Sequence, residues 1–300
     1  MDVAYEVALR TEAMRFLDSI GEDVGYEDVA RFTFRGMRIP LLDYSRGIRK
    51  PSQLSAALSF RTVYTAPDKT PPYADQEGLD GLLRYKMRGD DPEQAENRAL
   101  RAAMRAQLDL IWFVGVESGR YLPIYPVRLV AEETQDLQFV VALDREQRMI
   151  LGAAHTEPLE DIRRWAQQVT QRRLHQPIFR ARVLAAYQRR CAMCHLRHVN
   201  LLDASHILAD RHELGQAVVP NGLSLCKIHH AAFDQHLIGV RPDLQIAVRR
   251  DVLVEIDGPM LRHGIQELDG LRLETPRERS ARPDEARLEI RYNEFLSRIG

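Results

Sequence analysis

All three cysteines of this 300-residue chain lie between Cys191 and Cys226, close to several histidines. Cys191 and Cys194 are separated by two residues, and Cys226 is followed by His229 at the same spacing. Two such pairs supply the four sulfur and nitrogen ligands of a tetrahedral structural zinc site. An odd, clustered set of cysteines is a poor disulfide framework, and the alternative is a redox-active Cys-x-x-Cys pair beside an unrelated Cys226. The spacing predicts Zn²⁺ bound by these four residues.

A second set of polar residues follows the first cysteine pair in a fixed order. It runs Asp203-x-x-His-Ile, then Asn221-Gly-Leu-x-Leu-Cys, then His230 directly after the last zinc ligand. Over about 65 residues, 178–242, the chain resembles the HNH nuclease family, which carries these three motifs in this order. That family usually has cysteine where His229 stands here, so the division of roles between the two adjacent histidines is left open.

The HNH resemblance implies the ββα-metal fold, a β-hairpin followed by a helix, with zinc pinning the two together. It implies that His206, the histidine of the first motif, is the general base, because a neutral imidazole accepts a proton near pH 7. His230 then binds a catalytic divalent cation, Mg²⁺ or Mn²⁺, together with Asp203 or phosphate oxygens. Asn221 either fixes the loop that orients His206 or contacts the cation through its carbonyl, and Asp234 caps or orients the helix. The implied reaction is hydrolysis of DNA phosphodiesters.

A different group of aromatic and acidic residues stands in the N-terminal half. Tyr73-Ala-Asp75 is followed by Tyr85 twelve positions after the first tyrosine, then by Asn97-Arg-Ala-Leu and by a Tyr-rich strand. In this order the motifs resemble the SRA domain, a reader of modified cytosine with a PUA-like fold. The likeness covers about 80 residues. It departs from the family where a Pro-rich loop replaces the glycines around the first tyrosine, and where Gln76 replaces a second carboxylate.

The SRA resemblance implies a pocket for a cytosine that has been flipped out of the duplex. Such a base loses its stacking partners, and aromatic faces replace them. Tyr73 and Tyr85 are the expected stacking residues, with Tyr64 beside them. Asp75, with Gln76 as its substitute, is expected to read the N4 amino donor of a 5-methyl- or 5-hydroxymethylcytosine. The competing interpretation makes Tyr85 a core residue of a strand and Tyr73 a loop aromatic packed on prolines.

Hydrophobic periodicity predicts the elements that must position these residues. Helices are expected over 3–20, 93–106 and 284–298. Strands are expected over 58–65, 82–88, 109–116, 121–130, 137–143 and 244–257, with further alternation over 30–42. This mixture indicates an α+β protein with a curved sheet or barrel in its N-terminal part. The predicted domains are an SRA-like reader over 1–150, a connector over 151–177 and a zinc-containing HNH domain with a C-terminal extension over 178–300.

Eight arginines and no acidic residue lie between Ile162 and Arg190. Pro177 is expected to divide this stretch into two helices. Such a run is usually a solvated helix face, but its place directly before a metal motif favours a surface that grips phosphates. The residues expected to contact DNA phosphates are Arg163, Arg164, Arg172 and Arg173.

Composition narrows the class of protein. The chain is 45% hydrophobic and 28% charged, with a net charge of −1, which is typical of a globular protein. No apolar run approaches the roughly 18 residues of a membrane span, and the acidic N-terminus lacks the apolar core of a secretory signal. We therefore expect a cytoplasmic protein with no membrane partner.

Together these features predict a modification-dependent restriction endonuclease that acts on double-stranded, cytosine-modified DNA. One HNH site per chain indicates that a double-strand cut needs a homodimer. Two alternatives stay open. One is an HNH nuclease of a mobile element or repair pathway without modification dependence, and the other is a zinc module that binds DNA without cutting it. The presence of His206, Asn221 and His230 argues against the second.

Overall fold

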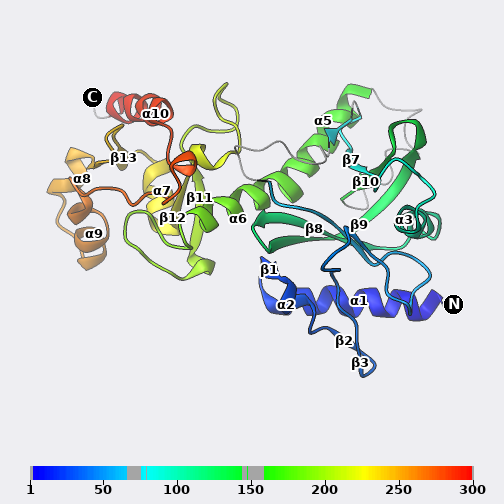
Figure 1. The fold of residues 1–300 in the computed structure, drawn as a ribbon. Helices are drawn as coiled ribbons and strands as arrows, with labels where there is room; N and C mark the ends of the chain where they lie inside the picture. Colours follow the sequence, from blue (N-terminus) through cyan, green and yellow to red (C-terminus); the bar gives the residue numbers. More distant parts are fainter. Residues whose placement is uncertain (1–2, 66–75, 79, 144–146, 148–158, 299–300) are drawn as a thin grey trace. The chain divides into compact units, whose positions relative to one another are not determined.

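A computed structural model describes residues 3–65, 76–78, 80–143, 147 and 159–298 (Figure 1). The chain divides into two compact units, the N-terminal unit (Met1–Ile178) and the C-terminal unit (Phe179–Gly300). The N-terminal unit is built on one large sheet, and the C-terminal unit on two small hairpins with helices, so the predicted α+β class is confirmed. Among the helices that the structure describes, none is long and apolar enough to cross a bilayer.

The sheet of the N-terminal unit is curved, as predicted. Its strands follow the order β4 (Ile48–Arg49), β5 (Ser59–Thr62), β8 (Leu110–Glu117), β9 (Arg120–Glu133), β10 (Gln138–Ala142), β7 (Leu83–Lys86) and β6 (Gln76–Glu77), and β1 (Val24–Gly25) also pairs with β9. β5 and β8 are parallel, and the other neighbours are antiparallel. The pairing of β9 shifts register against both β8 and β10, and such irregularities bend a strand.

The two faces of β8 pack into different layers because side chains alternate along a strand. Phe113 belongs to a core that it shares with helix α1 (Val3–Ile20), including the buried Leu17. Trp112 stacks instead on Phe60, with 5.4 Å between the ring centroids. β8 is buried along nearly all of its length, which explains why its sequence is a continuous apolar run and not an alternating one.

The remaining elements of the N-terminal unit are short helices and a hairpin. They are α2 (Tyr26–Val29), α3 (Ala95–Arg105), a 3₁₀ turn (Thr134–Asp136), and the pair β2 (Thr33–Phe34) and β3 (Met37–Arg38). α1 and α3 confirm the helices predicted over 3–20 and 93–106.

Pro177 does not divide the arginine-rich stretch into two helices, so that prediction is wrong. α5 (Leu159–Thr170) continues into a π-helical turn (Gln171–His175), which continues directly into α6 (Gln176–Ala186). A proline inside a helix lacks an amide donor and clashes with the carbonyl one turn earlier. The wider π turn ends at His175, two positions before Pro177, where it relieves this misfit without ending the helix.

The C-terminal unit contains the ββα arrangement that the HNH resemblance implies. β11 (Leu202–His206) and β12 (Gly222–Cys226) form an antiparallel hairpin in which Leu202 pairs with Cys226 and His206 with Gly222. α7 (Lys227–Asp234) follows β12 without a linker and packs on both strands. The short turn from strand to helix therefore fixes α7 against the hairpin.

The rest of the C-terminal unit extends this core. It comprises β13 (Ile238–Val240), β14 (Ile246–Val248), α8 (Arg250–Val254), α9 (Pro259–Gly264), α10 (Glu285–Ser297) and 3₁₀ turns at Val199–Leu201, Val219–Asn221, Gln266–Leu268 and Arg279–Ala281. α10 confirms the helix predicted over 284–298. The strand predicted over 244–257 is wrong beyond Val248, where pairing with β13 ends and α8 follows. Val252 is buried but Val254 and Ile256 are exposed, so the apolar alternation in this segment does not mark the buried face of a strand.

Candidate active site and zinc site

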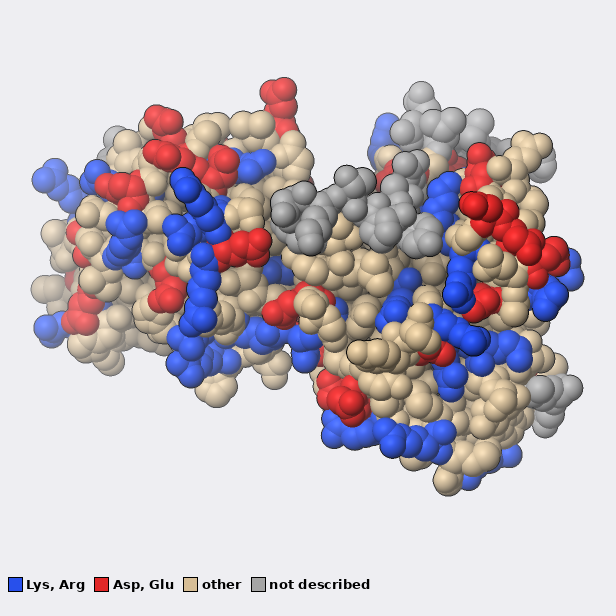
Figure 2. All heavy atoms as spheres, in the orientation of Figure 1, with Lys and Arg blue, Asp and Glu red and all other residues tan. Residues whose placement is uncertain are grey.

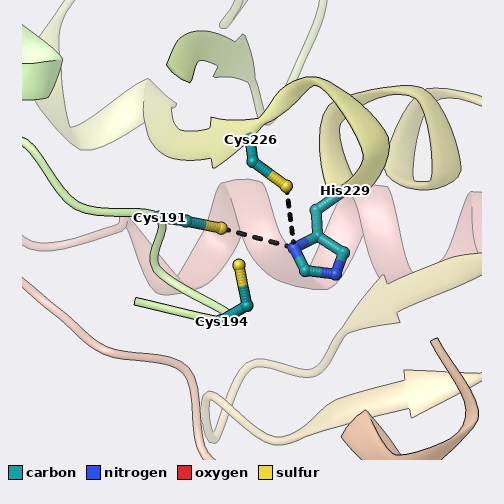
Figure 3. Close-up of side chains that lie close together, drawn as sticks. All are labelled: Cys191, Cys194, Cys226 and His229. Atoms are coloured by element: carbon teal, nitrogen blue, oxygen red, sulfur yellow. Dashed lines mark hydrogen bonds between the residues drawn. The ribbon is translucent and has the colours of Figure 1, made fainter. Parts of the chain in front are cut away.

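Cys191, Cys194, Cys226 and His229 converge in the C-terminal unit, as Figure 3 shows. Their ligand atoms all lie within 4.8 Å of one another, a spacing that a single ion can bridge. The Sγ atoms of Cys191 and Cys226 each lie 3.3 Å from Nδ1 of His229. Three thiols and one imidazole nitrogen are a donor set typical of structural zinc. The residues therefore fit a zinc ion.

The surroundings of His229 prepare it to bind zinc through Nδ1. Its Nε2 lies 2.7 Å from the carbonyl oxygen of Gly264, and a donor at Nε2 leaves the lone pair of Nδ1 directed at the thiols. Burial disfavours the charged imidazole, but hydrogen bonds with Cys191 and Cys226 outweigh it and raise the pKa of His229 to about 10. A zinc ion at Nδ1 would take the place of this proton, because a ligating imidazole must be deprotonated there. In the cluster found among the described residues the histidine is His229 and not His230.

His206 is the last residue of β11 and packs against α6. The ring of Phe179 stacks on its imidazole, with 4.1 Å between centroids and 16° between planes. Its Nε2 lies 3.0 Å from Oδ1 of Asp210. Burial lowers the pKa of His206, and the charge of His230 lowers it further against the opposing effects of Asp210 and Asp234. The imidazole is thus neutral near pH 7, the state that a general base requires.

Asn221 is fully buried at the end of the loop that joins β11 to β12. Its Oδ1 accepts a hydrogen bond from the backbone N–H of Leu208 at 3.0 Å. Its Nδ2 donates to the carbonyls of Leu208, at 2.9 Å, and Gln216, at 3.1 Å. The backbone carbonyl of Asn221 also accepts from the N–H of Ile207 at 2.9 Å. These contacts tie the two ends of the loop beside His206, which favours the loop-fixing role over direct contact with a cation.

His230 lies on α7 with a carboxylate near each ring nitrogen. Nδ1 is 3.5 Å from Oδ2 of Asp203, and Nε2 is 3.3 Å from Oδ2 of Asp234. Hydrogen bonds with these two carboxylates raise the pKa of His230 to about 9. The interaction with His230 is also the main reason that the pKa of Asp203 is lowered. The predicted pair of Asp203 and His230 is thus brought together, and Asp234 joins it.

The contribution of α6 to this site was missed at the sequence level. Arg180 donates through Nη2 to the carbonyls of Val199 and Leu202, and its Nε lies 3.5 Å from Oδ1 of Asp203. Phe179 stacks on His206 as described above. Both residues belong to the arginine-rich run between Ile162 and Arg190. Nothing in the sequence of that run indicates which residues its apolar side chains contact.

The glycine at position 222 is the feature of the sequence that could have indicated the close packing of α6 on the hairpin. A Cβ atom at this position would lie 2.5 Å from Cγ2 of Val183 and 2.9 Å from Cζ of Phe179. Glycine therefore lets α6 approach the hairpin closely, and the Asn-Gly pair of the second motif implies that some element lies there. Asp210 was also missed, since it stands in the loop after β11 without any motif around it.

The described part of the N-terminal unit contains a pocket of about 190 Å³ whose lining includes Gly47, Thr65 and Tyr85. Tyr85 is only 8% exposed. Its ring lies 4.6 Å from that of Phe60, and its hydroxyl donates to the carbonyl of Arg61 at 3.2 Å. Tyr85 is therefore a core residue of β7, as the competing interpretation held, and it also lines the pocket.

The structure describes only some of the other residues that were expected to line a base pocket. Tyr64 is half-buried and stands between two residues of the pocket lining, Val63 and Thr65. Gln76 is the first residue of β6. Tyr73 and Asp75 lie outside the described residues.

The four arginines expected to contact phosphates occupy α5 and the π turn. Arg163 and Arg164 lie in α5, and Arg164 is exposed. Arg172 is also exposed, whereas the Nη2 atom of Arg173 donates to the carbonyl of Tyr125 at 3.1 Å. Arg164 and Arg172 thus have side chains that reach solvent.

Comparison with known proteins identifies the C-terminal segment. Residues 191–241 match the model of a family described as HNH endonuclease. Among solved structures, the chain is similar to a modification-dependent TagI restriction endonuclease, with 15% identity and a TM-score of 0.31 over 84% of this chain and 86% of that one. It is also similar to the type IV phosphorothioation-dependent restriction endonuclease ScoMcrA, with 16% identity and a TM-score of 0.24 over 63% of this chain and 48% of that one. A search of curated protein sequences gives no match.

Both TM-scores are low, so the identification of the C-terminal segment as a nuclease domain depends on the family match and on the residues of the site. The matched segment begins at Cys191 and includes the hairpin, α7 and all four residues of the cysteine–histidine cluster. Residues 191–241 are therefore an HNH endonuclease domain, and this domain makes the chain an endonuclease.

Proposed function

We propose that the chain is a modification-dependent restriction endonuclease that recognises 5-methyl- or 5-hydroxymethylcytosine in double-stranded DNA. The observation that carries the proposal is the grouping of His206, Asn221 and His230 on one ββα element beside a zinc-binding cluster. A module that only binds DNA has no need of a histidine with a lowered pKa and a second histidine flanked by two carboxylates on the same ββα element.

In this proposal His206 removes a proton from the water that attacks the phosphate. Its low pKa keeps the imidazole unprotonated, and the ring of Phe179 limits the orientations it can take. Asn221 holds the loop next to His206 in place. His230 is a ligand of a divalent cation, Mg²⁺ or Mn²⁺. When bound, such an ion stabilises the charge that develops on the phosphate and the leaving oxygen.

The pocket of the N-terminal unit supports recognition of a flipped base. At about 190 Å³ it is smaller than the roughly 300–1,000 Å³ of pockets for drug-sized ligands, and so suits a single nucleobase. Tyr85 contributes an aromatic ring to its wall, and Thr65 and Lys86 contribute polar groups. Aromatic and polar lining is what a flipped base needs for stacking and for recognition of its edge.

The distribution of charge supports binding to the DNA backbone. The net charge is only −1, but Figure 2 shows Lys and Arg side chains forming a nearly continuous band on the visible face of the C-terminal unit. Such a local concentration of positive charge can attract the phosphate backbone even though the net charge of the chain is close to zero. Cutting both strands with one site per chain calls for two copies. A protein that restricts incoming DNA would act in the cytoplasm, and we include this location in the proposal.

The test is cleavage by the full chain of matched duplexes that carry cytosine, 5-methylcytosine or 5-hydroxymethylcytosine, with Mg²⁺ or Mn²⁺ present. We expect cutting of at least one modified duplex at a rate ten or more times that of the plain duplex, since stacking of one base is worth roughly 1–3 kcal/mol. Equal cutting of all three would leave an HNH nuclease without modification dependence, the alternative function.

A further inference from the structure

The imidazole of His230 lies between two carboxylates, and only one of its ring nitrogens can bind the catalytic cation. Asp203 is near Nδ1 at 3.5 Å, and Asp234 is near Nε2 at 3.3 Å. A histidine that binds a metal commonly donates its other N–H to a carboxylate, which fixes the ring. One of the two aspartates is therefore placed to share the cation with His230, and the other to orient the ring.

Asp203 is already engaged by the protein. Its Oδ1 accepts a hydrogen bond from the backbone N–H of Ala204 at 2.9 Å and lies 3.5 Å from Nε of Arg180. Its Oδ2 faces His230. Both oxygens thus have partners, and the guanidinium compensates the negative charge, which weakens the attraction of this carboxylate for a cation.

Asp234 has the features of a metal ligand. It stands four residues after His230 on α7, so the two side chains share one face of the helix, the spacing at which helices present paired metal ligands. Its side chain is 53% exposed, against 42% for that of Asp203. A cation bound there keeps access to water and to a phosphate, which Mg²⁺ and Mn²⁺ sites commonly include.

The position of His206 also favours Asp234. Asp203 pairs with Leu225 near one end of the hairpin, whereas His206 pairs with Gly222 at the other end. Three residues of extended strand separate their Cα atoms by roughly 10 Å. Besides burial, the charges that shift the pKa of His206 are those of Asp210, His230 and Asp234, and the charge of Asp203 is not among them. Since the base and the cation must act on one phosphate, the cation belongs on the Asp234 side.

We propose that Asp234 and Nε2 of His230 are the protein ligands of the catalytic cation, and that Asp203 is a positioning residue that accepts the Nδ1–H of His230. This inference deepens the proposed function, because it rests on a cation at His230. It reverses the role given to Asp203 by the HNH resemblance, and it replaces the helix-capping role first expected of Asp234.

The test measures Mn²⁺ binding to the zinc-loaded full chain by calorimetry, without DNA. Asp234→Asn should lower the affinity to the level of His230→Ala, whereas Asp203→Asn should lower it by only about 10–100-fold, as loss of an orienting carboxylate does. Asp234→His should restore binding to within a few-fold of the unaltered chain because imidazole is also a ligand, and Asp203→His should not. Asp243→Asn, an exposed aspartate paired with Arg241, is the matched control.

Zinc content and unfolding temperature identify any variant that fails to fold. If Asp234→Asn fails to fold, the Mn²⁺ affinity of Asp234→His tests the inference in its place. An Asp234→Asn variant that keeps its Mn²⁺ affinity, or an Asp203→Asn variant that loses as much as His230→Ala, would overturn the inference. Cleavage of DNA is scored separately. A chain that binds Mn²⁺ through Asp234 but cuts no DNA would refute the proposed function and leave the ligand assignment intact.

Discussion

The two units of the chain keep their functional residues in place by different means. In the C-terminal unit, a cluster of three cysteines and His229 ties the hairpin to α7 at one point. In the N-terminal unit the pocket is lined partly by strands of the large sheet, and that unit contains buried contacts such as the ion pair of Glu6 with Arg10 in α1. We therefore expect the proposed catalytic site to depend on bound zinc and the pocket to depend on packing, so each should fail under a different perturbation.

The largest expected effect is loss of the zinc site. Cys194→Ala should abolish zinc binding and unfold the C-terminal unit, because binding of structural zinc is worth on the order of 10 kcal/mol and is linked to folding. Both tryptophans, Trp112 and Trp165, lie in the N-terminal unit. Their fluorescence transition should therefore persist while zinc content falls to zero. His195→Ala, at the exposed neighbour of Cys194, is the control, and a folded, metal-free C-terminal unit would contradict the expectation.

The next effect concerns the buried ion pair of the N-terminal unit. Glu6→Gln should destabilise that unit by roughly 3 kcal/mol, since Arg10 is left buried without its partner. Burial alone would raise the pKa of Glu6, but hydrogen bonds from Ser55 and Arg10 outweigh it and lower the pKa below its ordinary 4.5. The carboxylate therefore stabilises the unit above about pH 4.5, and this contribution disappears as the pH falls further.

Unfolding followed by tryptophan fluorescence at pH 7 and at pH 3 checks this expectation. The difference between Glu6→Gln and the unaltered chain should be large at pH 7 and smaller at pH 3, which lies below the ordinary pKa of 4.5. Glu12→Gln, in an exposed pair with Arg15, should change little at either pH. An equal loss at both pH values would contradict the role given to the Glu6 charge.

Filling the pocket should separate recognition from cutting. Gly47→Val would place a Cβ atom 3.7 Å from the hydroxyl of Tyr85, an ordinary contact, with its methyl groups taking up pocket volume. We expect a loss of about tenfold in the preference for modified DNA, with unchanged zinc content. Gly258→Val, at a position where a Cβ meets nothing within 4 Å, is the matched control. An unaffected preference would show that the base binds elsewhere.

The smallest expected effect is a shift in pH dependence. Burial lowers the pKa of His206, and Phe179→Leu reduces the cover on its ring. The pKa should rise towards the ordinary 6.5, so more of the base is protonated in mild acid. Activity at pH 6 should fall a few-fold while activity at pH 8 changes little.

A pH–rate profile of Phe179→Leu beside that of Phe295→Leu checks this shift. Phe295 is another buried phenylalanine of the C-terminal unit, and it stacks on Tyr292. Any loss of activity in Phe295→Leu, the control, should be the same at all pH values. A uniform loss in Phe179→Leu as well would mean that the stacked ring only stabilises the fold.

The HNH motifs could be found in the sequence because their chemistry depends on short spacings. The zinc cluster, the hairpin and α7 all lie within residues 191–234, and the turn from Cys226 to His229 is set by a single helical turn. What supports them comes from farther away. Phe179 and Arg180 reach the site from α6, and no spacing in the sequence connects them to His206.

In the N-terminal unit the sequence predicted the individual elements but not how they pair. Periodicity predicted most of its strands and the helices α1 and α3, because burial on one or two faces leaves a pattern in the sequence. It could not show that β5 pairs with β8 in parallel, or that the ring of Tyr85 packs on Phe60. Such pairings depend on contacts between residues far apart along the chain. In the C-terminal unit the pattern over 250–256 misled, since Val254 and Ile256 alternate at the surface.

The most direct test of the account is single-turnover cleavage of a cytosine-modified duplex by His206→Ala, with DNA binding and zinc content measured on the same preparation. The account predicts a cleavage rate at least a hundredfold lower, as expected for loss of a general base, with DNA binding and zinc content unchanged. A rate within a few-fold of the unaltered chain would contradict the assignment of His206 as the base of this endonuclease.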